Sequence, residues 1–314
     1  MRRILITGIG GDVACSIIRC LKDSNDPDEI YGMDIKKYTP YMDVIKKAFV
    51  APRYDDESYV PFVEKLLDEY GITHFLPTTE YEISLWNERR DYFEKRDIKL
   101  LINNRKIIEI CMSKYKTAGF LKEAGIDTPE TYYAESYKGG LSYPFIIKSD
   151  SGCGSKKLKT IHDEKEWEEC EKSGMICQEL VGDADNEYTV GVFSDGSVIN
   201  SITLKRQLGY GGLSVFVEVC DIPGIGELAV KAAKAFDLKG CFNIQLRKQG
   251  EKYYVFEINP RLSSTTGFRH KFGFTDAVWW VDSSDGIPVP GYINNAEGMI
   301  GVKVMDDVVL GRQG

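Results

Sequence analysis

The chain has 314 residues, 43% of them hydrophobic, and carries 48 acidic against 40 basic side chains for a net charge of −8. This length exceeds that of an average domain and can build two or three hydrophobic cores. The acidic balance argues against bulk affinity for nucleic acid. Since the sequence has no run of about 20 apolar residues, we expect no membrane span either.

The cysteines and the N-terminal segment predict the cellular compartment of the protein. The eight cysteines are scattered and include no C-x-x-C pair, so neither a disulfide framework nor a zinc site is indicated. The N-terminal segment runs from an apolar strand into glycines and has no small-residue cleavage site. We therefore expect a cytoplasmic protein with reduced thiols.

The N-terminal third of the chain alternates strand and helix patterns. Strand patterns occur at residues 3–7, 29–34, 73–77 and 98–102, and helix patterns at 13–22 and 59–70. Such alternation implies a parallel sheet with crossover helices. The fold class expected for this part is α/β.

A turn containing Gly8, Gly10 and Gly11 follows the first strand, and Asp34 ends the next one. The pattern resembles a dinucleotide-binding fingerprint, in which glycines let backbone amides approach phosphate. The third glycine of that fingerprint is missing. Because a lone match is weak evidence, we favour a simple tight turn between strand and helix.

Polar residues 78–80 follow the strand at 73–77. They stand at the carboxyl end of that strand, where open α/β sheets bind ligands. Glu80 is therefore either a substrate contact or an acidic residue at the start of a helix, and the pattern leaves both interpretations open.

Beyond residue 113 strand patterns dominate. An amphipathic helix at 114–124 precedes a strand at 143–148, which ends in Lys148 and leads into a polar loop at 149–156. Further strands are predicted at 175–181, 187–193, 198–205 and 213–220, then a helix at 225–236 and a closing strand at 301–310. The expected class of this part is α+β.

A hairpin is predicted near the C-terminus, with two strands joined by the turn at 248–252. Side-chain alternation places on one face of its second strand Tyr253, Val255, Glu257 and Asn259. If the register is even, oxygens of Gln245, Glu257 and Asn259 converge, and hard oxygen ligands of this kind suit magnesium. Taken alone, the pattern also fits a half-exposed hairpin with ordinary polar residues.

The polar residues of the chain form an ordered series that runs from Lys114 and Lys148 through Glu187 to the hairpin and Arg261. This series resembles the ATP-grasp superfamily over essentially the whole chain. It is most similar to the carbamoyl-phosphate-synthase large-subunit-like branch, in which a glutamine stands at the first metal position, as Gln245 does here. The resemblance implies a Rossmann-like domain at residues 1–112, a small lid lobe at 113–182 and a C-terminal lobe at 183–314.

The resemblance also implies a role for each member of the series. The expected ATP contacts are Lys114, Lys148, the lid residues Ser151, Gly152, Gly154 and Ser155, the hinge residues Glu179, Leu180 and Val181, and Glu187 on the ribose. The expected ligands of two magnesium ions are Gln245, Glu257 and Asn259. Lys205, Arg206 and Arg261 would be catalytic, stabilising the transferred phosphoryl group or the acyl intermediate. Taken alone, such cations are more often solvated surface residues.

Two polar segments outside this series are expected to contact the substrates. They contribute Glu80, Arg269, His270 and Lys271. The predicted activity is that of an ATP-dependent ligase, which activates a small-molecule carboxylate as an acyl phosphate, releases ADP and joins the acyl group to an amine. A homodimer is a further expectation.

Three alternatives stay open from the sequence. The first is bicarbonate activation, as in carbamoyl phosphate synthesis. The second is a nucleotide-binding protein without catalysis. The third is an NAD-dependent oxidoreductase built on the glycine turn, which would leave Gln245, Glu257, Asn259 and Arg261 unexplained.

Overall fold

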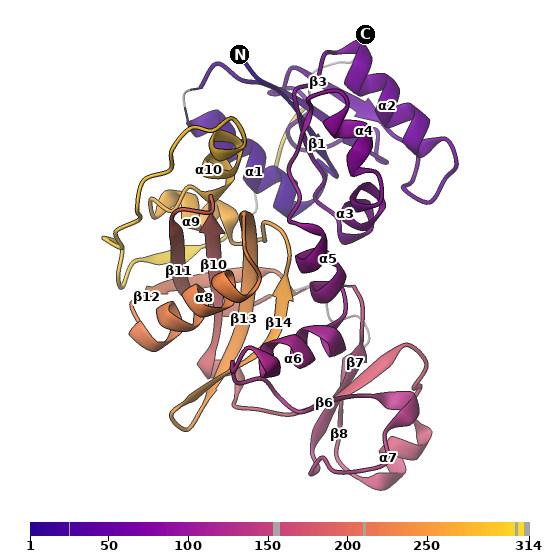
Figure 1. Cartoon of the computed structure of the whole chain (residues 1–314), viewed down its shortest axis with the longest axis vertical. Helices are drawn as coiled ribbons and strands as arrows, with labels where there is room; N and C mark the ends of the chain where they lie inside the picture. The colour runs from indigo at the N-terminus through magenta and orange to yellow at the C-terminus, as the bar shows by residue number, and fades with distance from the viewer. Residues whose placement is uncertain (25, 153–157, 210–211, 305–306, 311–314) are drawn as a thin grey trace. The chain divides into compact units, whose positions relative to one another are not determined.

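Figure 1 shows the computed structural model of the chain, which describes residues 1–24, 26–152, 158–209, 212–304 and 307–310. Its contacts divide the chain into two compact units. The first contains Met1–Asn103, Arg261–Gly291 and Val304–Gly314, and the second contains Asn104–Pro260 and Tyr292–Lys303. The division expected from the sequence assigns residues 261–291 to the C-terminal lobe, whereas their contacts group them with the N-terminal residues.

The first unit is built on a five-stranded sheet with the order β3-β2-β1-β4-β5. Its strands are β1 (Arg3–Thr7), β2 (Glu29–Asp34), β3 (Lys47–Val50), β4 (His74–Leu76) and β5 (Lys99–Leu100). Every pair is parallel, which confirms the α/β class. Strand β1 pairs with β2 on one side, and after β3 the chain returns to place β4 on the other side, so the carboxyl ends of β1 and β4 flank the switch point of the sheet.

Helices cover this sheet because each has an apolar side. They are α1 (Asp12–Asp23), α2 (Tyr59–Glu69), α3 (Glu80–Asn87) and α4 (Arg90–Glu94). In the core, Phe75 on β4 stacks on Phe93 with ring centres 5.5 Å apart and meets the edge of Trp86 at 5.4 Å. Aromatic pairs of this kind add to the stability that apolar burial provides.

The C-terminal segment of the first unit contributes α9 (Thr266–Lys271) and α10 (Asp276–Ser284). Helix α9 packs on α1. The close approach requires Gly267, because a Cβ there would lie 3.2 Å from the Ser16 hydroxyl and 3.1 Å from Arg19. Neither short helix was expected from the sequence.

The second unit begins with α5 (Arg105–Cys111) and α6 (Lys114–Glu123), followed by a four-stranded antiparallel sheet. The strand order is β6-β9-β7-β8, with β6 (Thr131–Tyr133), β7 (Phe145–Ser149), β8 (Lys159–Ile161) and β9 (Met175–Glu179). Helix α7 (Glu164–Glu169) contributes Trp167, whose ring packs edge-on against Phe145 at 5.5 Å. Short 3₁₀ helices occur at Ala134–Ser136 and Ala184–Asn186.

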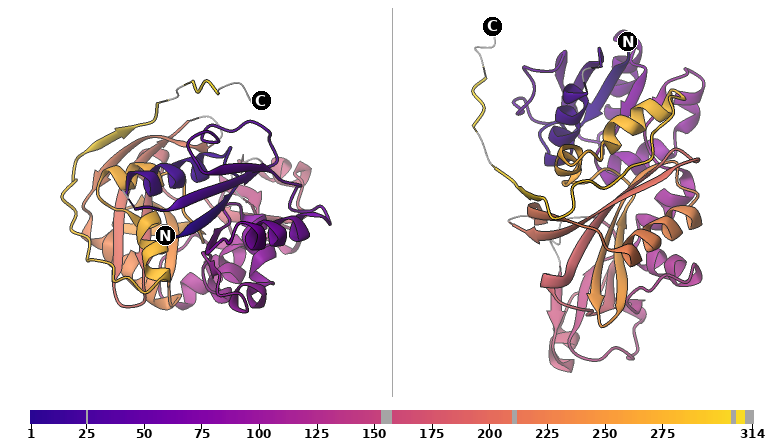
Figure 2. Two further views of the ribbon diagram at one scale, coloured as in Figure 1. Left: turned by 90° about the horizontal axis from the view of Figure 1, so that it is seen from above. Right: turned by 90° about the vertical axis from the view of Figure 1, so that its left-hand side faces the viewer.

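The rest of the second unit is a six-stranded sheet with the order β14-β13-β10-β11-β12-β15. The strands are β10 (Glu187–Ser194), β11 (Ile199–Leu208), β12 (Ser214–Cys220), β13 (Gly240–Gln249), β14 (Lys252–Asn259) and β15 (Ile300–Val302). The right-hand view of Figure 2 shows its long orange strands lying side by side. Strand β15 ends at Val302, so the strand expected at 301–310 is far shorter in the described part of the chain.

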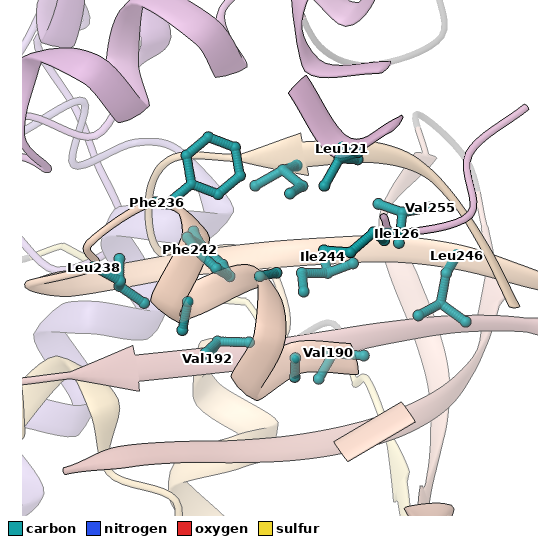
Figure 3. Close-up of a cluster of buried hydrophobic side chains, with 14 of the residues drawn as sticks. Leu121, Ile126, Val190, Val192, Phe236, Leu238, Phe242, Ile244, Leu246 and Val255 are labelled. Carbon is teal, nitrogen blue, oxygen red and sulfur yellow. The ribbon is translucent and has the colours of Figure 1, made fainter. Parts of the chain in front are cut away.

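Helix α8 (Pro223–Ala235) packs against one face of this sheet. Its buried residues Ile225, Ala229, Ala232 and Ala233 recur at helical spacing and meet Val190 and Val192 of β10. Figure 3 shows the cluster, in which Leu121 of α6 and Val255 of β14 also take part. We call this side of the sheet the core face and the opposite side the polar face.

The structure corrects one expectation about the hairpin. Gln245 lies opposite Glu257 and Asn243 lies opposite Asn259, so the even register is confirmed. Leu246, however, pairs with Val255, which leaves Phe256 as an extra residue in a β-bulge. Simple alternation therefore fails across Phe256, and buried Val255 lies on the core face rather than beside Glu257.

Among the described residues, no helix is both long enough and apolar enough to span a membrane.

Candidate active site

Polar side chains gather on the polar face of the six-stranded sheet, where β10, β11, β13 and β14 lie side by side. Since Val190 and Ile244 belong to the core, their neighbours along each strand face the other way. Register then places on the polar face Glu187, Arg206, Gln245, Arg247, Glu257 and Asn259. The structure thus brings the three expected metal ligands together on adjacent strands.

The donor set of this face fits magnesium. Gln245 and Glu257 are direct partners across β13 and β14, and Asn259 follows two residues later on the same side. Within the described ranges, no group of three or more His, Cys, Asp or Glu side chains could hold a metal ion. Magnesium does not require such a group, since it binds through one or two carboxylates and completes its shell with waters and substrate phosphates.

Glu187 is held by two arginines at the start of β10. Its Oε1 accepts hydrogen bonds from Arg206 Nε at 3.0 Å and Nη2 at 2.6 Å, and its Oε2 accepts one from Arg247 Nε at 3.0 Å. Arg206 Nη2 also donates to Gln245 Oε1 at 3.1 Å. This network fixes the amide of an expected metal ligand, because the oxygen must face the arginine. Both oxygens of Glu187 are engaged in this way before any ribose is bound.

The two lysines of the expected phosphate site lie close to the same face. Lys114 Nζ stands 3.6 Å from Glu257 Oε1 and donates to the carbonyl of Gly152 at 2.8 Å. Lys148 is buried, and its ammonium lies 5.4 Å from the centre of the Phe256 ring. Four cations, Lys114, Lys148, Arg206 and Arg247, therefore accompany two carboxylates, so the face carries excess positive charge that suits a polyphosphate.

The position of Lys114 depends on Asp150, which the sequence analysis did not select. Asp150 Oδ1 accepts from the Ser113 hydroxyl at 3.0 Å and from the backbone N–H of Tyr115 at 2.9 Å. Its carbonyl accepts from the N–H of Lys114 at 3.0 Å. Because Ser113 is the N-cap of α6, this aspartate ties the start of the polar loop to the helix that carries Lys114. The Ser113 cap was the available signal.

Burial shifts the protonation of Lys148. Loss of hydration is the main cause that lowers its pKa to about 8, with Glu257 opposing the shift and Lys114 and Arg247 adding to it. The ammonium is charged below that pH and loses its proton as the pH rises through it. If Lys148 binds a phosphate, as the sequence predicts, the phosphate favours the charged form, and nucleotide binding above this pH takes up a proton.

We expect ATP affinity to be highest below pH 8 and to fall by up to roughly tenfold per pH unit above it, since one proton is taken up on binding. The dissociation constant of a fluorescent ATP analogue, measured from pH 6.5 to 9.5, checks this expectation. Lys148→Arg should flatten the profile because arginine stays charged throughout. A flat profile for the unaltered protein would show that Lys148 does not bind phosphate.

The structure separates two residues that the sequence analysis placed together. Arg206 lies on the polar face, whereas Lys205 pairs with Tyr188 of the core cluster and with Glu218, so its side chain lies on the core face. Consecutive strand residues point to opposite sides of a sheet. Lys205 therefore cannot face Gln245 from β11, which argues against its expected contact, beside Arg206, with the γ-phosphate or the acyl intermediate.

The expected lid and hinge are described in part. Ser151 and Gly152 follow β7, while Gly154 and Ser155 lie outside the described residues. In the hinge, the backbone N–H of Glu179 donates to the carbonyl of Glu130 at 2.8 Å, and its carboxylate accepts from the N–H of Glu130 at 3.2 Å. Leu180 and Val181 continue beyond the end of β9, and Val181 is buried. Their contact with adenine stays a prediction.

Arg261 and Glu80 form an ion pair within the first unit. Arg261 Nη2 donates to Glu80 Oε1 at 2.9 Å, and Nη1 donates to the carbonyl of Leu262 at 3.1 Å. Glu80 is the first residue of α3, so both interpretations of its position in the sequence are consistent with its place. The sequence pattern points to each of the two residues separately and contains no signal that they pair.

The other expected substrate contacts differ from one another. Arg269 is 1% exposed, and its five N–H groups donate to Asp276 and to three hydroxyls, those of Ser263, Thr265 and Thr266. A guanidinium with every donor engaged has none to offer a substrate, so Arg269 is a structural residue.

His270 and Lys271 follow Arg269 on α9 and are less buried. His270 Nε2 lies 3.9 Å from Asp23 Oδ2, and burial lowers the pKa of the imidazole. Lys271 is exposed. Contact of either residue with a substrate stays a prediction.

At the glycine turn of the first unit, backbone N–H groups bind the carboxylate of the protein's own Asp34. Gly10 N–H donates to Asp34 Oδ2 at 2.8 Å, and Lys36 N–H donates to Asp34 Oδ1 at 2.8 Å. In a dinucleotide site an acid at this place would accept from the ribose. Here both oxygens accept from backbone, which argues for the tight-turn interpretation.

Comparisons with known proteins agree with this architecture. Residues 111–265 match the family model of an ATP-grasp domain, and residues 4–101 match that of a PylC-like, N-terminal domain. The chain carries an ATP-grasp domain. The fold expected from the ordered series of Lys114 through Arg261 is thereby confirmed.

The ATP-grasp domain has relatives among carbamoyl phosphate synthases. The large chain of Pseudothermotoga lettingae is 25% identical over 202 residues, which are 57% of this chain and 18% of that protein. This chain therefore spans less than a fifth of the length of that relative.

Solved structures of low sequence identity share the fold. The biotin carboxylase domain dimer of Hydrogenobacter thermophilus 2-oxoglutarate carboxylase, described with MgADP and bicarbonate, has a TM-score of 0.73 at 16% identity and covers 94% of this chain and 72% of its own. The L-amino acid ligase of Bacillus licheniformis has a TM-score of 0.71 at 16% identity and covers 90% and 74%.

Proposed function

We propose that this chain is an ATP-dependent ligase that activates a small-molecule carboxylate and joins it to an amine. The observation that carries the proposal is the polar face of the six-stranded sheet, where Gln245, Glu257 and Asn259 lie in register and Lys114 Nζ stands 3.6 Å from Glu257 Oε1. Oxygen ligands for magnesium next to cations for phosphate are what phosphoryl transfer requires.

In the proposed reaction a carboxylate oxygen attacks the γ-phosphorus of ATP. The bond between this phosphorus and the bridging oxygen breaks, ADP leaves, and an acyl phosphate forms. The amine then attacks the acyl carbon, phosphate leaves with its electron pair, and the amine loses a proton to give the amide. Bound magnesium would supply charge neutralisation at the phosphates.

This chain's own residues bind and position the reactants in this proposal. Lys114 and Lys148 hold the phosphates as point charges, and Glu257 with Gln245 and Asn259 holds the metal. Arg206 orients Gln245 through their 3.1 Å hydrogen bond. Arg261, two residues after Asn259 in the chain, stabilises the transferred phosphoryl group.

Two findings favour the bicarbonate alternative. Curated relatives are carbamoyl phosphate synthase large chains, and the Hydrogenobacter domain is described with bicarbonate. Bicarbonate is itself a carboxylate that ATP can activate as a carboxyphosphate, so the same residues would serve. The acceptor screen below separates the two, since only this alternative predicts ADP release with bicarbonate as the sole carboxylate.

Three further expectations belong to this proposal. A homodimer is proposed, with the Hydrogenobacter domain dimer as support. The proposed substrates are small molecules, and the proposed localisation is the cytoplasm.

An ADP-release screen tests the function. Purified protein with Mg-ATP is expected to release ADP only when a matching carboxylate and amine are present, with a product mass equal to the two joined with loss of water. Bicarbonate, NAD and reactions without amine serve as comparison arms. Release of ADP without any dependence on carboxylate would contradict the proposal.

Binding provides an independent measurement. Saturating Mg-ATP is expected to raise the melting temperature, because a ligand at a hundred times its Kd stabilises by about 2.7 kcal/mol. A larger shift with NAD than with Mg-ATP would favour the oxidoreductase alternative. A shift with Mg-ATP but no ADP release in any arm would favour the non-catalytic nucleotide-binding protein.

A further inference from the structure

The ion pair between Glu80 and Arg261 joins two distant parts of the sequence within one compact unit. The two side chains are only 12% and 13% exposed, and their atoms approach to 2.9 Å. A pair so well shielded is stronger than an exposed surface pair, since less water competes for either partner. The guanidinium is fixed further by its bond to the carbonyl of Leu262.

Glu80 is itself held in place by the fold. It is the first residue of α3, directly after Thr79, which caps the helix by accepting from the N–H of Glu82 at 3.3 Å. A negative charge in the first turn of a helix is stabilised by the helix dipole. The carboxylate therefore projects from a rigid element that follows the carboxyl end of β4.

The backbone beyond Arg261 is also anchored. Ser263 and Thr265 accept hydrogen bonds from buried Arg269 at 2.9 and 2.6 Å, and Arg269 is paired with Asp276 at 2.6 Å. The segment that follows Arg261 therefore has little freedom. The Arg261 side chain and the backbone that follows it are therefore both restrained by hydrogen bonds.

We propose that Glu80 is a positioning residue that orients Arg261 for phosphoryl transfer, rather than a substrate contact. This inference rests on the proposed ligase function. A long arginine side chain has many rotamers, and an unrestrained one would have to be ordered in each catalytic cycle. The Glu80 carboxylate holds the guanidinium in one geometry before the substrates bind, and positioning of this kind is what speeds transfer.

The expected loss follows from this role. Glu80→Gln keeps the shape but removes the charge, and we expect kcat to fall roughly 10–100-fold while KM for ATP changes by no more than a few-fold. Glu80→Ala should lose more. The control is Glu29→Gln in the same unit, whose carboxylate is 19% exposed and pairs with Lys46 at 2.7 Å and Arg3 at 3.2 Å. It should leave kcat unchanged.

A double-mutant cycle separates positioning from a merely structural role. If Glu80 acts through Arg261, then Glu80→Gln added to Arg261→Ala should cost no further activity. A loss of the same size in both backgrounds would overturn the proposal. So would a rise in KM for the carboxylate or amine with unchanged kcat, since that pattern marks a direct substrate contact.

Chemical modification of Arg261 tests its pairing with Glu80 without requiring enzyme turnover. Phenylglyoxal modifies accessible arginines, and peptide mass spectrometry can follow Arg261 alone. Glu80→Gln and Glu80→Ala should raise its modification rate several-fold, whereas Glu29→Gln should not. Equal rates in all variants would overturn the proposal. If the unaltered protein releases no ADP with any acceptor, the ligase function fails, and this rate still decides whether Glu80 restrains Arg261.

Discussion

Glu257→Gln is expected to lower kcat for ADP release by about 10²–10³-fold while leaving the fold intact. Glutamine has the same shape, so packing at the end of β14 should not change. The variant removes the only carboxylate among the three expected metal ligands and also the negative partner of Lys114, which stands 3.6 Å away. Charge stabilisation of magnesium and of the lysine is therefore lost together.

The measurement is steady-state ADP release with the substrate pair that the screen identifies, at several magnesium concentrations. Glu251→Gln is the matched control, because Glu251 lies exposed in the turn of the same hairpin. The control should retain full activity, and Glu257→Gln should need more magnesium for half-maximal nucleotide binding. Near-normal turnover of Glu257→Gln would show that the hairpin is structural.

The hairpin shows how far the sequence could predict this site. Gln245, Glu257 and Asn259 occupy alternate positions of two strands joined by a short turn, so an even register was sufficient to bring them to one face. The register of a hairpin is set by its short turn and by the alternation of its residues, and both can be recognised in the sequence. The same pattern could not reveal the bulge at Phe256, which changes the face of Val255 and brings the Phe256 ring under Lys148.

Residues whose partners are distant in the sequence were not predicted. Arg247 has the alternation of a polar-face residue, but its contact with Glu187 spans 60 positions of the sequence. Asp150 holds the N-terminus of α6 from a loop 37 residues away from Ser113. The Ser113 cap marks the start of α6 but does not name Asp150 as its partner, and the Arg247–Glu187 contact is set by the order of β10 and β13 in the sheet.

Arg269 shows the opposite error, in which a local pattern suggested function. A run of three basic residues, Arg269, His270 and Lys271, soon after the hairpin fits an anion-binding segment. On the short helix α9, however, successive residues point about 100° apart, so the three cannot share one environment. Arg269 faces the interior, where Asp276 on the next helix neutralises it, and Lys271 faces solvent.

Arg269→Ala is expected to destabilise the first unit by about 3–5 kcal/mol, the usual cost of removing one partner of a buried ion pair. The buried Asp276 carboxylate would lose its counter-charge, and the hydroxyls of Ser263, Thr265 and Thr266 would lose a shared donor. Lys271→Ala, two residues further and exposed, should change stability by less than about 0.5 kcal/mol.

Urea unfolding followed by tryptophan fluorescence measures the loss, since Trp279 and Trp280 lie on α10 beside Asp276. The cost arises mainly from the uncompensated charge, so the double variant Arg269→Met with Asp276→Leu should recover most of the stability that Arg269→Ala loses. A small effect of Arg269→Ala would mean that water reaches this network and that Arg269 keeps donors for a ligand.

Because the same network anchors the segment after Arg261, a folded but looser Arg269→Ala should also show faster phenylglyoxal modification of Arg261, whereas Lys271→Ala should not.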